Sequence, residues 1–147
     1  MLNYGNWFKV PYAITYFYNV YGKREINNGK YATLIASFVE KMKAAKPLTI
    51  VSPGTQMRNF THIDDIIEGL VLIGKNGYGD NFGIGSDESF SILEVAKLFG
   101  GEIEMLPERK GNRMSADVIT AKTRALGWSP KCSLENYIAS KRAKNWN

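Results

Sequence analysis

The sequence predicts a single domain of the α/β class, or α+β when it is taken as an isolated piece. Short apolar segments of strand length alternate with longer segments whose apolar residues recur at helical spacing, which is typical of these classes. The chain has 147 residues, enough to bury one substantial core. We therefore treat residues 1–147 as one domain.

The first predicted strand covers residues 10–18, which are rich in β-branched and aromatic side chains. Such a continuous apolar run is typical of a strand buried inside a parallel sheet. No predicted strand precedes it. We therefore expect residues 1–22 to be the last part of a larger sheet region that continues outside the chain.

Periodicity and chain breakers predict the remaining elements of the first half. One apolar segment at helical spacing has lysines crowding its end before Pro47, which favours a helix that stops there. Short extended segments and a helix with an acidic first turn follow. These elements are a helix over residues 31–45, strands over 48–51 and 59–62, and a helix over 63–73.

The second half continues the alternation after a turn over residues 76–80. Ser89 is expected to cap the next helix and Gly100 to end it. A polar loop then separates the last predicted strand from two closing helices. The predicted elements are a strand over residues 81–85, a helix over 91–99, a strand over 102–106, a loop over 107–113 and helices over 117–126 and 133–144.

The composition limits the classes of partner and chemistry. The formal charge is +5, with 19 basic and 14 acidic residues, which favours an anionic partner such as a nucleotide. Part of the excess lies in residues 141–147, as expected of a solvated helix end. A basic nucleic-acid-binding domain stays an alternative, but we predict no nucleic-acid partner.

Single copies of cysteine and histidine, Cys132 and His62, exclude an internal disulfide and leave zinc without a ligand set. No signal-peptide pattern opens the sequence. No apolar run approaches the roughly 18 residues that a membrane span requires. We expect a cytoplasmic protein without a membrane partner.

Arg58 is the leading candidate for ligand binding. It stands at a strand entrance, just before the apolar residues Phe60 and Ile63, which are expected to be buried, so its stem is expected to be held in place. A guanidinium binds phosphate oxygens through two parallel charged hydrogen bonds. The alternative is an ion pair with Asp64 or Asp65 that fastens the start of the helix.

Three further polar residues are weaker candidates. Arg109 lies in a loop after a strand, where ligand sites of open α/β proteins gather, although a solvated loop residue looks the same in sequence. Asn19 can bond a sugar hydroxyl or a phosphate, or cap its own turn. His62 is more typical of a satisfied core histidine than of a base. Gly83 and Gly85 do not form a dinucleotide fingerprint, because Glu88 stands where the third glycine would be.

Four segments, which follow one another in the family's order, resemble the extended short-chain dehydrogenase/reductases of the NAD-dependent epimerase/dehydratase family, to which UDP-glucose 4-epimerase belongs. The first is similar to the family's Arg-Tyr-Phe-Asn-Val-Tyr-Gly, and the second to its Gly-x-x-x-Arg-Asp-Phe-x-x-Val-x-Asp. The third is similar to an Asn-Ile-Gly strand with a Ser-Ile-Leu helix, and the fourth to Arg-x-Gly-Asp followed by Leu-Gly-Trp-x-Pro. These segments are residues 16–22, 54–65, 81–93 and 109–130.

The resemblance implies an extended Rossmann-type fold, of which this chain is the C-terminal substrate-binding domain and residues 1–22 the end of the Rossmann sheet region. It implies a UDP-linked sugar as substrate and NAD as cofactor. Asn19 would contact the sugar or its phosphate, and Arg58 and Arg109 the pyrophosphate. Near the phosphates, the resemblance also implies contacts from Thr33 and Leu34. The base would be contacted by Thr49, Val51 and Phe60, and the ribose by Asn112. The nicotinamide of NAD would be lined by Phe17 and Tyr18.

The sequence departs from the family pattern at three residues and in two of its motifs. Tyr16 replaces an arginine, and Asn59 and Asn112 replace aspartates, which removes the charged contribution of those hydrogen bonds. The family's Gly-rich NAD loop and Tyr-x-x-x-Lys catalytic pair are expected to be missing, since both would fall upstream of Met1. We therefore assign no catalytic residue, and we expect this chain alone neither to bind NAD nor to turn over.

The sequence thus predicts the nucleotide-sugar-binding portion of an NAD-dependent epimerase, in which NAD would oxidise the sugar transiently at C4. A dehydratase or decarboxylase of the same family, and a non-catalytic nucleotide-sugar-binding module, are the alternatives. For the complete enzyme, a homodimer is one of the assemblies that we consider.

Overall fold

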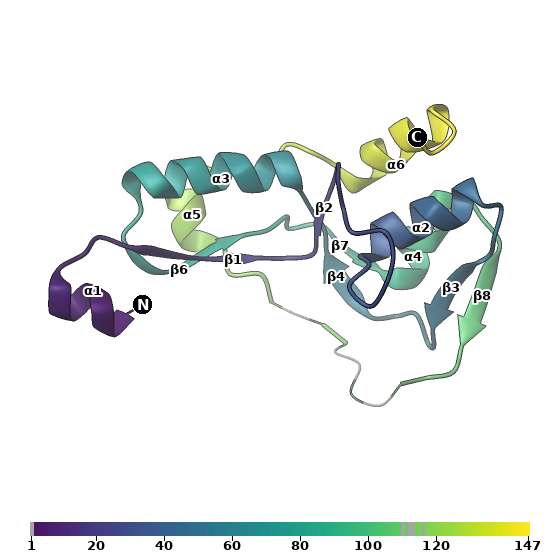
Figure 1. Cartoon of the computed structure of the whole chain (residues 1–147), viewed down its shortest axis with the longest axis horizontal. Helices are drawn as coiled ribbons and strands as arrows, with labels where there is room; N and C mark the ends of the chain where they lie inside the picture. The colour runs from purple at the N-terminus through teal and green to yellow at the C-terminus, as the bar shows by residue number, and fades with distance from the viewer. Residues whose placement is uncertain (1, 110, 112–113, 116) are drawn as a thin grey trace.

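The computed structural model describes residues 2–109, 111, 114–115 and 117–147. The described chain is elongated and has two regions joined by short strands (Figure 1). The first region contains α1 (Leu2–Phe8), β1 (Ala13–Phe17), α3 (Ile63–Asn76), β6 (Gly79–Ile84) and α5 (Ala121–Ala125). The second contains α2 (Leu34–Lys43), β3 (Leu48–Val51), β4 (Met57–Asn59), β7 (Ser89–Ser91), α4 (Ile92–Phe99), β8 (Ile103–Leu106) and α6 (Leu134–Ala143). The junction is formed by β2 (Val20–Tyr21) and β5 (Thr61–His62).

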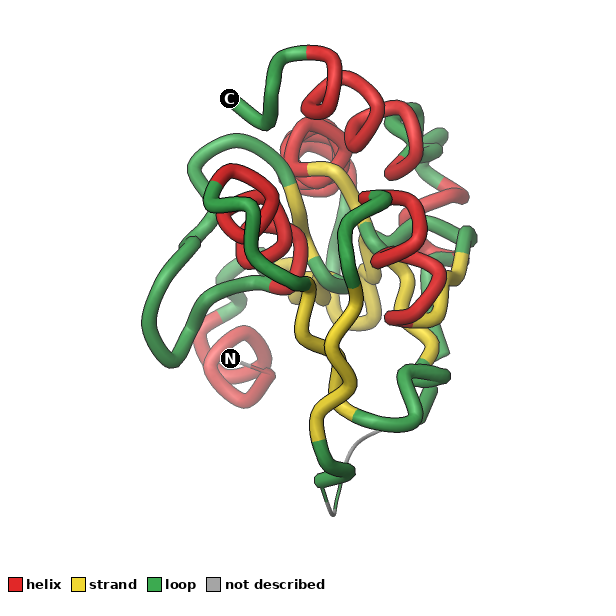
Figure 2. The backbone as a smooth tube through the Cα atoms, turned by 90° about the vertical axis from the view of Figure 1, so that its right-hand side faces the viewer, coloured by secondary structure: helices red, strands yellow, loops and turns green. Residues whose placement is uncertain are grey.

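The strands pair mainly in parallel. β1 pairs with β6, β2 with β5 and β3 with β8, all parallel, while β4 and β7 form an antiparallel pair. Parallel neighbours need long crossover connections, and helices supply them here. Figure 2 shows the helices packed around the strands, with the N-terminal helix at the far end of the molecule.

The helices begin at the polar residues that sequence chemistry favours. Thr33 caps α2 by accepting a hydrogen bond from the amide of Ala36. At α4, Ser91 and Glu94 form a reciprocal capping box, which satisfies two amides that the helix cannot bond itself. Gly100 ends α4 in the left-handed conformation, as predicted.

The second region encloses the larger apolar core, which we call the major core. Leu48 and Ile50 of β3 are at most 1% exposed, and Phe38 of α2 meets Phe99 of α4 edge to face at 5.4 Å between ring centroids. The buried members of the major core are Tyr21, Ile35, Phe38, Val39, Leu48, Ile50, Phe60, Val95, Ala96, Phe99, Leu134 and Ile138.

The first region has a smaller core, the minor core, formed by Ile66, Ile73, Phe82, Ile84 and Trp128. α3 packs on this face of β1 and β6. The approach is close, since a Cβ on Gly69 of α3 would lie 2.9 Å from the Cδ1 atom of Ile84. A larger residue at this crossing of α3 and β6 would force the Ile84 side chain to shift.

Several sequence predictions differ from the structure. The first strand is not buried on both sides, because in the described chain it pairs only with β6, and Tyr16 and Phe17 are 45% and 49% exposed. Ser91, and not Ser89, caps α4. The helix predicted over residues 117–126 is confined to α5, and α1 and β7 were not predicted. Apolar periodicity is a weak guide in such short elements.

Candidate functional site

A cavity of about 220 Å³ opens between α2, β3, β4 and the start of α4. Pockets for drug-sized ligands measure roughly 300–1,000 Å³, so this cavity suits one part of a nucleotide. Its lining residues are Leu34, Thr49, Ile50, Val51, Gln56, Arg58 and Ile92.

Arg58 lies in the middle of β4, opposite Phe90 of β7. Its Nη1 atom donates a hydrogen bond of 2.7 Å to the carbonyl oxygen of Met57. The residue is half-buried, as the sequence predicted, and this bond orients the guanidinium at the cavity. A positive charge held there is suited to an anionic ligand group.

The start of α2 contributes a second positive element. Leu34, the first residue of α2, lines the cavity, so the positive end of the helix dipole lies beside it. The hydroxyl of Thr33, however, caps the helix and donates to Glu25. Thr33 therefore supports the helix start, and it is not among the residues that line the cavity.

β3 contributes the two residues that the resemblance places near the base. Thr49 and Val51 both line the cavity. The side-chain hydroxyl of Thr49 accepts a hydrogen bond from Lys41, whose pKa is lowered chiefly by burial. A hydroxyl that accepts from lysine keeps its own O–H as a donor.

Asn19, Phe17 and Tyr18 lie outside this cavity. The Nδ2 atom of Asn19 donates to the carbonyl oxygen of Asn59 at 3.0 Å, which ties the β1–β2 connection to β4. The hydroxyl of Tyr18 accepts from the amide of Ile119 at 3.1 Å. Tyr18 lines a separate cavity of about 100 Å³ with Tyr16, Asn81 and Ile119, and Phe17 is half exposed beside it in β1.

The remaining predicted contacts are not brought together at the cavity. Phe60 is 5% exposed and belongs to the major core, so it faces away from a ligand. Arg109 is exposed in the loop after β8. Asn112 lies outside the described residues. The predicted two-arginine grip on a pyrophosphate therefore stays a prediction.

The acidic pair and the histidine near Arg58 have structural partners. His62 caps α3, its Nδ1 atom accepting from the amide of Asp64 at 3.2 Å. Asp65 is 2% exposed, and its carboxylate accepts from the amides of Lys131 and Cys132, both at 3.0 Å. These hydrogen bonds of Asp65 therefore join the segment before α6 to α3.

Two departures from the family pattern have physical explanations here. The Nδ2 atom of Asn59 donates to the carbonyl oxygens of Ser86 and Asp87 at 3.0 and 3.2 Å, bonds that an aspartate cannot donate. The hydroxyl of Tyr16 donates to Asp80 at 2.9 Å, and this bond raises the pKa of Tyr16. Each substitution thus has its own local partner.

The Tyr-x-x-x-Lys spacing occurs once in the sequence, at Tyr137 and Lys141 of α6. The hydroxyl of Tyr137 donates to the carbonyl oxygen of Gly22 at 3.1 Å, and the Nζ atom of Lys141 donates to the carbonyl oxygen of Asn147. Burial raises the pKa of Tyr137 to about 12, the opposite of what a catalytic base needs.

Gly83 and Gly85 lie in closely packed surroundings. A Cβ on Gly83 would lie 1.8 Å from the carbonyl oxygen of Ile119, and one on Gly85 would lie 2.6 Å from the ring of Tyr18. These glycines therefore allow close packing and do not open a phosphate loop. Phe17 and Tyr18 are left as the only predicted cofactor contacts within the described chain.

Sequence reasoning missed three lining residues, Ile50, Gln56 and Ile92. The Nε2 atom of Gln56 donates to the carbonyl oxygens of Val51 and Ser52 at 3.3 and 3.5 Å, so the side chain holds the turn after β3. No spacing in the sequence distinguishes such a glutamine from a surface one.

Two further absences apply to the described residues alone. Among them, no helix combines the length and the apolar character needed to cross a membrane. Within the same residues, no group of three or more His, Cys, Asp or Glu side chains is placed to hold a metal ion.

The parallel strand pairs with helical crossovers and the cavity beside them define an open-sheet α/β protein. The profile of the NAD-dependent epimerase/dehydratase family matches residues 1–85. The chain belongs to this family. Its architecture is that of the C-terminal, substrate-binding portion of an extended short-chain dehydrogenase/reductase.

Known proteins resemble the chain over most of its length. It is 30% identical over 142 residues to UDP-glucuronic acid decarboxylase 2 of Arabidopsis thaliana, covering 90% of this chain and 31% of that one. The solved UDP-glucose 4-epimerase of Thermotoga maritima, with UDP-glucose, has 25% identity and a TM-score of 0.89 over 99% of this chain and 50% of its own.

A third relative has been solved with NAD bound. The solved UDP-glucuronic acid 4-epimerase of Bacillus cereus, in complex with UDP-glucuronic acid and NAD, has 28% identity and a TM-score of 0.83. The match covers 98% of this chain and 48% of that chain. The chain thus spans between about a third and a half of the length of these relatives.

Proposed function

We propose that this chain is the nucleotide-sugar-binding portion of an NAD-dependent nucleotide-sugar epimerase similar to UDP-glucose 4-epimerase. The observation that carries the proposal is the cavity lined by Arg58, the start of α2 and residues of β3. A cationic group and a helix N-terminus suit a diphosphate, while the size of the cavity suits a base or a ribose.

The contribution of the chain is binding and orientation. Arg58 would hold the pyrophosphate, and Thr49 and Val51 would meet the base. Binding energy gathered at the nucleotide, remote from the reacting sugar, fixes the position of the sugar carbon. The sequence assigns no catalytic residue, so we propose that this chain alone binds the nucleotide but does not turn over.

The likeness to solved epimerases with UDP-linked ligands supports a UDP-sugar as the substrate. The likeness to a decarboxylase at 30% identity supports a second candidate, a UDP-glucuronic acid decarboxylase of the same fold. Both candidates bind UDP through the same cavity. The product separates them, because a decarboxylase removes the C6 carboxylate of UDP-glucuronic acid, whereas an epimerase keeps every carbon of the sugar.

The test is calorimetric titration of the chain with UDP, UDP-glucose and UDP-glucuronic acid. Arg58→Ala should weaken UDP binding by about 1.5–3 kcal/mol, because a charged hydrogen bond is lost. Arg24→Ala is the matched control, since Arg24 is an exposed arginine outside the cavity. Unchanged UDP affinity in folded Arg58→Ala removes this residue from the site.

The titration also distinguishes the alternative functions. An oligonucleotide that binds as well as UDP, with a steep dependence on salt, would favour a nucleic-acid-binding domain. UDP binding that persists with no activity in any longer form of the protein would favour a non-catalytic binding module. No binding of any nucleotide would refute the proposed function.

A further inference from the structure

One buried hydrogen-bonding atom in the wall of the Arg58 cavity has no partner within the described residues. Gln56 is 3% exposed and lines the cavity, and its Oε1 atom makes no hydrogen bond in the described part of the chain. A buried acceptor that stays unpaired costs free energy. An unpaired oxygen on a residue that lines a cavity therefore indicates a donor on the ligand.

The orientation of the Gln56 side chain is fixed by its nitrogen. The Nε2 atom donates to the carbonyl oxygens of Val51 and Ser52 at 3.3 and 3.5 Å. Both partners only accept, so turning the amide over would place its oxygen against two other oxygens. Oε1 is therefore held as an acceptor beside the turn that follows β3.

A second polar group of the same wall has the opposite character. The hydroxyl of Thr49 accepts a hydrogen bond from the Nζ atom of Lys41, and an ammonium group can only donate. The O–H of Thr49 then points away from Lys41 and serves as a donor. The cavity thus offers a ligand one oriented donor, from Thr49, and one oriented acceptor, from Gln56.

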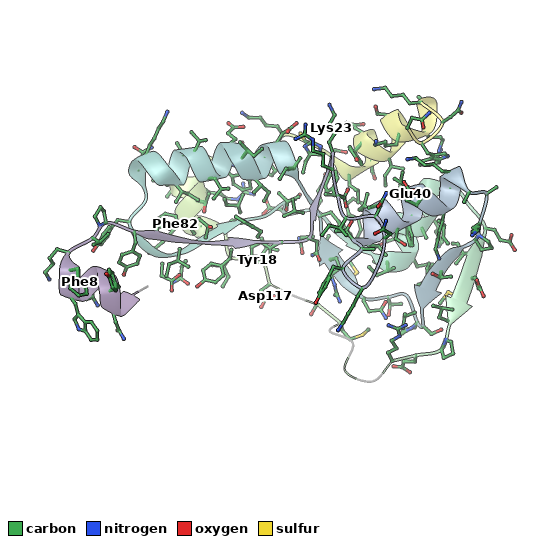
Figure 3. The ribbon with its side chains drawn as sticks, in the orientation of Figure 1. Phe8, Tyr18, Lys23, Glu40, Phe82 and Asp117 are labelled. Carbon is green, nitrogen blue, oxygen red and sulfur yellow. The ribbon has the colours of Figure 1, made fainter. Side chains whose placement is uncertain are left out.

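Lys41 acts from behind this wall and is not among the residues that line the cavity. It follows Glu40, which Figure 3 labels on α2, and it lies in the last turn of that helix, which packs on β3. Burial lowers the pKa of Lys41, whereas the negative charge of Glu104, which pairs in register with Thr49, favours the ammonium form. The fold therefore holds a charged donor against the Thr49 hydroxyl.

We propose that Gln56, together with Lys41 acting through Thr49, determines which base the cavity accepts, and that the accepted group is an imide edge, as in uracil. This inference rests on the proposed function, because it takes the ligand to be a nucleotide whose base enters this cavity. An imide carries an N–H donor beside a carbonyl acceptor. The N3 proton of uracil would be donated to Oε1 of Gln56, and a neighbouring carbonyl oxygen of the base would accept from the Thr49 hydroxyl.

Cytosine does not match this pattern, because its N3 atom is an acceptor and would face the oxygen of Gln56 without a proton between them. Within this arrangement Gln56 and Thr49 contact the base. Lys41 is a positioning residue, since it reaches the ligand only through Thr49.

The test is calorimetric titration of the unmodified chain with UDP, CDP and 3-methyluridine diphosphate, in which a methyl group replaces the N3 proton. UDP should bind about tenfold or more tightly than either of the other two, because each of them leaves a buried group unpaired. A second measurement needs no variant. By NMR, exchange of the N3 proton of UDP with water should slow when the nucleotide binds.

Lys41→Met removes the ammonium group and keeps a long side chain, and circular dichroism checks that the variant is folded. The Thr49 hydroxyl is then free to accept as well as to donate, so the preference for UDP over CDP should fall about fivefold. The preference over 3-methyluridine diphosphate should stay, since it depends on Gln56. Lys41→Arg keeps a donor and should keep the preference over CDP. Lys75→Met is the matched control, because Lys75 is an exposed lysine in the last turn of α3.

Three results would overturn the inference. Equal affinity of the unmodified chain for UDP and CDP would show that the cavity does not select the base. An unchanged preference in folded Lys41→Met, or a loss that Lys75→Met reproduces, would remove Lys41 from the selection. Unslowed exchange of the N3 proton in bound UDP would remove Gln56. UDP binding that persists in these cases leaves the proposed function standing, whereas the absence of binding by all three nucleotides refutes both proposals.

Discussion

The two regions of the molecule differ in how completely each encloses its apolar residues. The major core is surrounded by α2, α4 and α6 around β3, and its larger side chains have almost no exposure. The minor core has α3 on one face of β1 and β6, and large apolar side chains remain exposed around it. One region encloses its apolar residues, whereas the other leaves several large apolar side chains exposed.

The difference also bears on the candidate site. The cavity with Arg58 lies in the region with the complete core, so its walls are held by packing. A ligand site needs such a rigid scaffold. The exposed apolar side chains Trp7, Phe8 and Phe17 lie in the other region.

Matched isoleucine truncations test the comparison most directly. Ile35 and Ile73 are 1% and 2% exposed, in the major and minor cores respectively. Ile35→Ala should lower the free energy of unfolding by about 4 kcal/mol and Ile73→Ala by about 2 kcal/mol, since a cavity in the less enclosed core can collapse or hydrate. Urea unfolding followed by circular dichroism measures both. Equal losses would mean that the two cores are equally well packed.

Asp65 joins α3 of the first region to the segment before α6. Asp65→Ala leaves the amides of Lys131 and Cys132 without their acceptor, and the expected cost is about 3 kcal/mol of unfolding free energy. Asp64→Ala is the control, because its side chain is 75% exposed. A loss below that of the control would show that water replaces the carboxylate, and hence that this junction is open.

The helix cap of α4 tests the second region at a smaller scale. Ser91→Ala should cost about 1 kcal/mol, since the amide of Glu94 loses its acceptor. Ser89→Ala, at the residue that sequence chemistry favours as the cap, should cost almost nothing. Thermal unfolding of the two variants compares them, and a larger loss at Ser89 would place the cap where the sequence predicted it.

The smallest effect concerns pH. The backbone amide and hydroxyl of Ser91 donate to the carboxylate of Glu94 at 2.7 and 2.8 Å, and these bonds lower the pKa of Glu94 from 4.5. A lowered folded-state pKa stabilises the protein above the unfolded-state pKa, and this contribution is lost as pH falls through the folded-state value. The stability difference between the unmodified chain and Glu94→Gln should therefore shrink on acidification. A difference that grows on acidification would contradict the cap.

Sequence predicted the fold best where local chemistry and tertiary packing agree. The strand over residues 48–51 was predicted with the bounds that β3 has, because Pro47 and Ser52-Pro53-Gly54 bracket an apolar run. The first strand was predicted as buried on both sides, since its composition reflects a complete sheet. The described chain supplies one neighbour for it, and composition alone does not reveal which neighbours are present.

The candidate site was predictable in part. Leu34, Thr49, Val51 and Arg58, which the resemblance implied as substrate contacts, line one cavity, and their binding of a ligand stays a prediction. Phe60 does not, because it is 5% exposed and packs in the major core. Gln56 was missed because its role depends on backbone carbonyls of a turn five residues earlier, which no pattern of side chains records.

The three tryptophans lie in three different environments, and this gives the molecule a separate optical signal for each part. Trp7 is 74% exposed on α1, Trp128 is 2% exposed and donates its indole N–H to the carbonyl oxygen of Asp65, and Trp146 stacks on Phe99 at 5.3 Å. Indole emission shifts to shorter wavelength in apolar surroundings. Variants that keep one tryptophan each would therefore let fluorescence follow α1, the minor core and the major core independently.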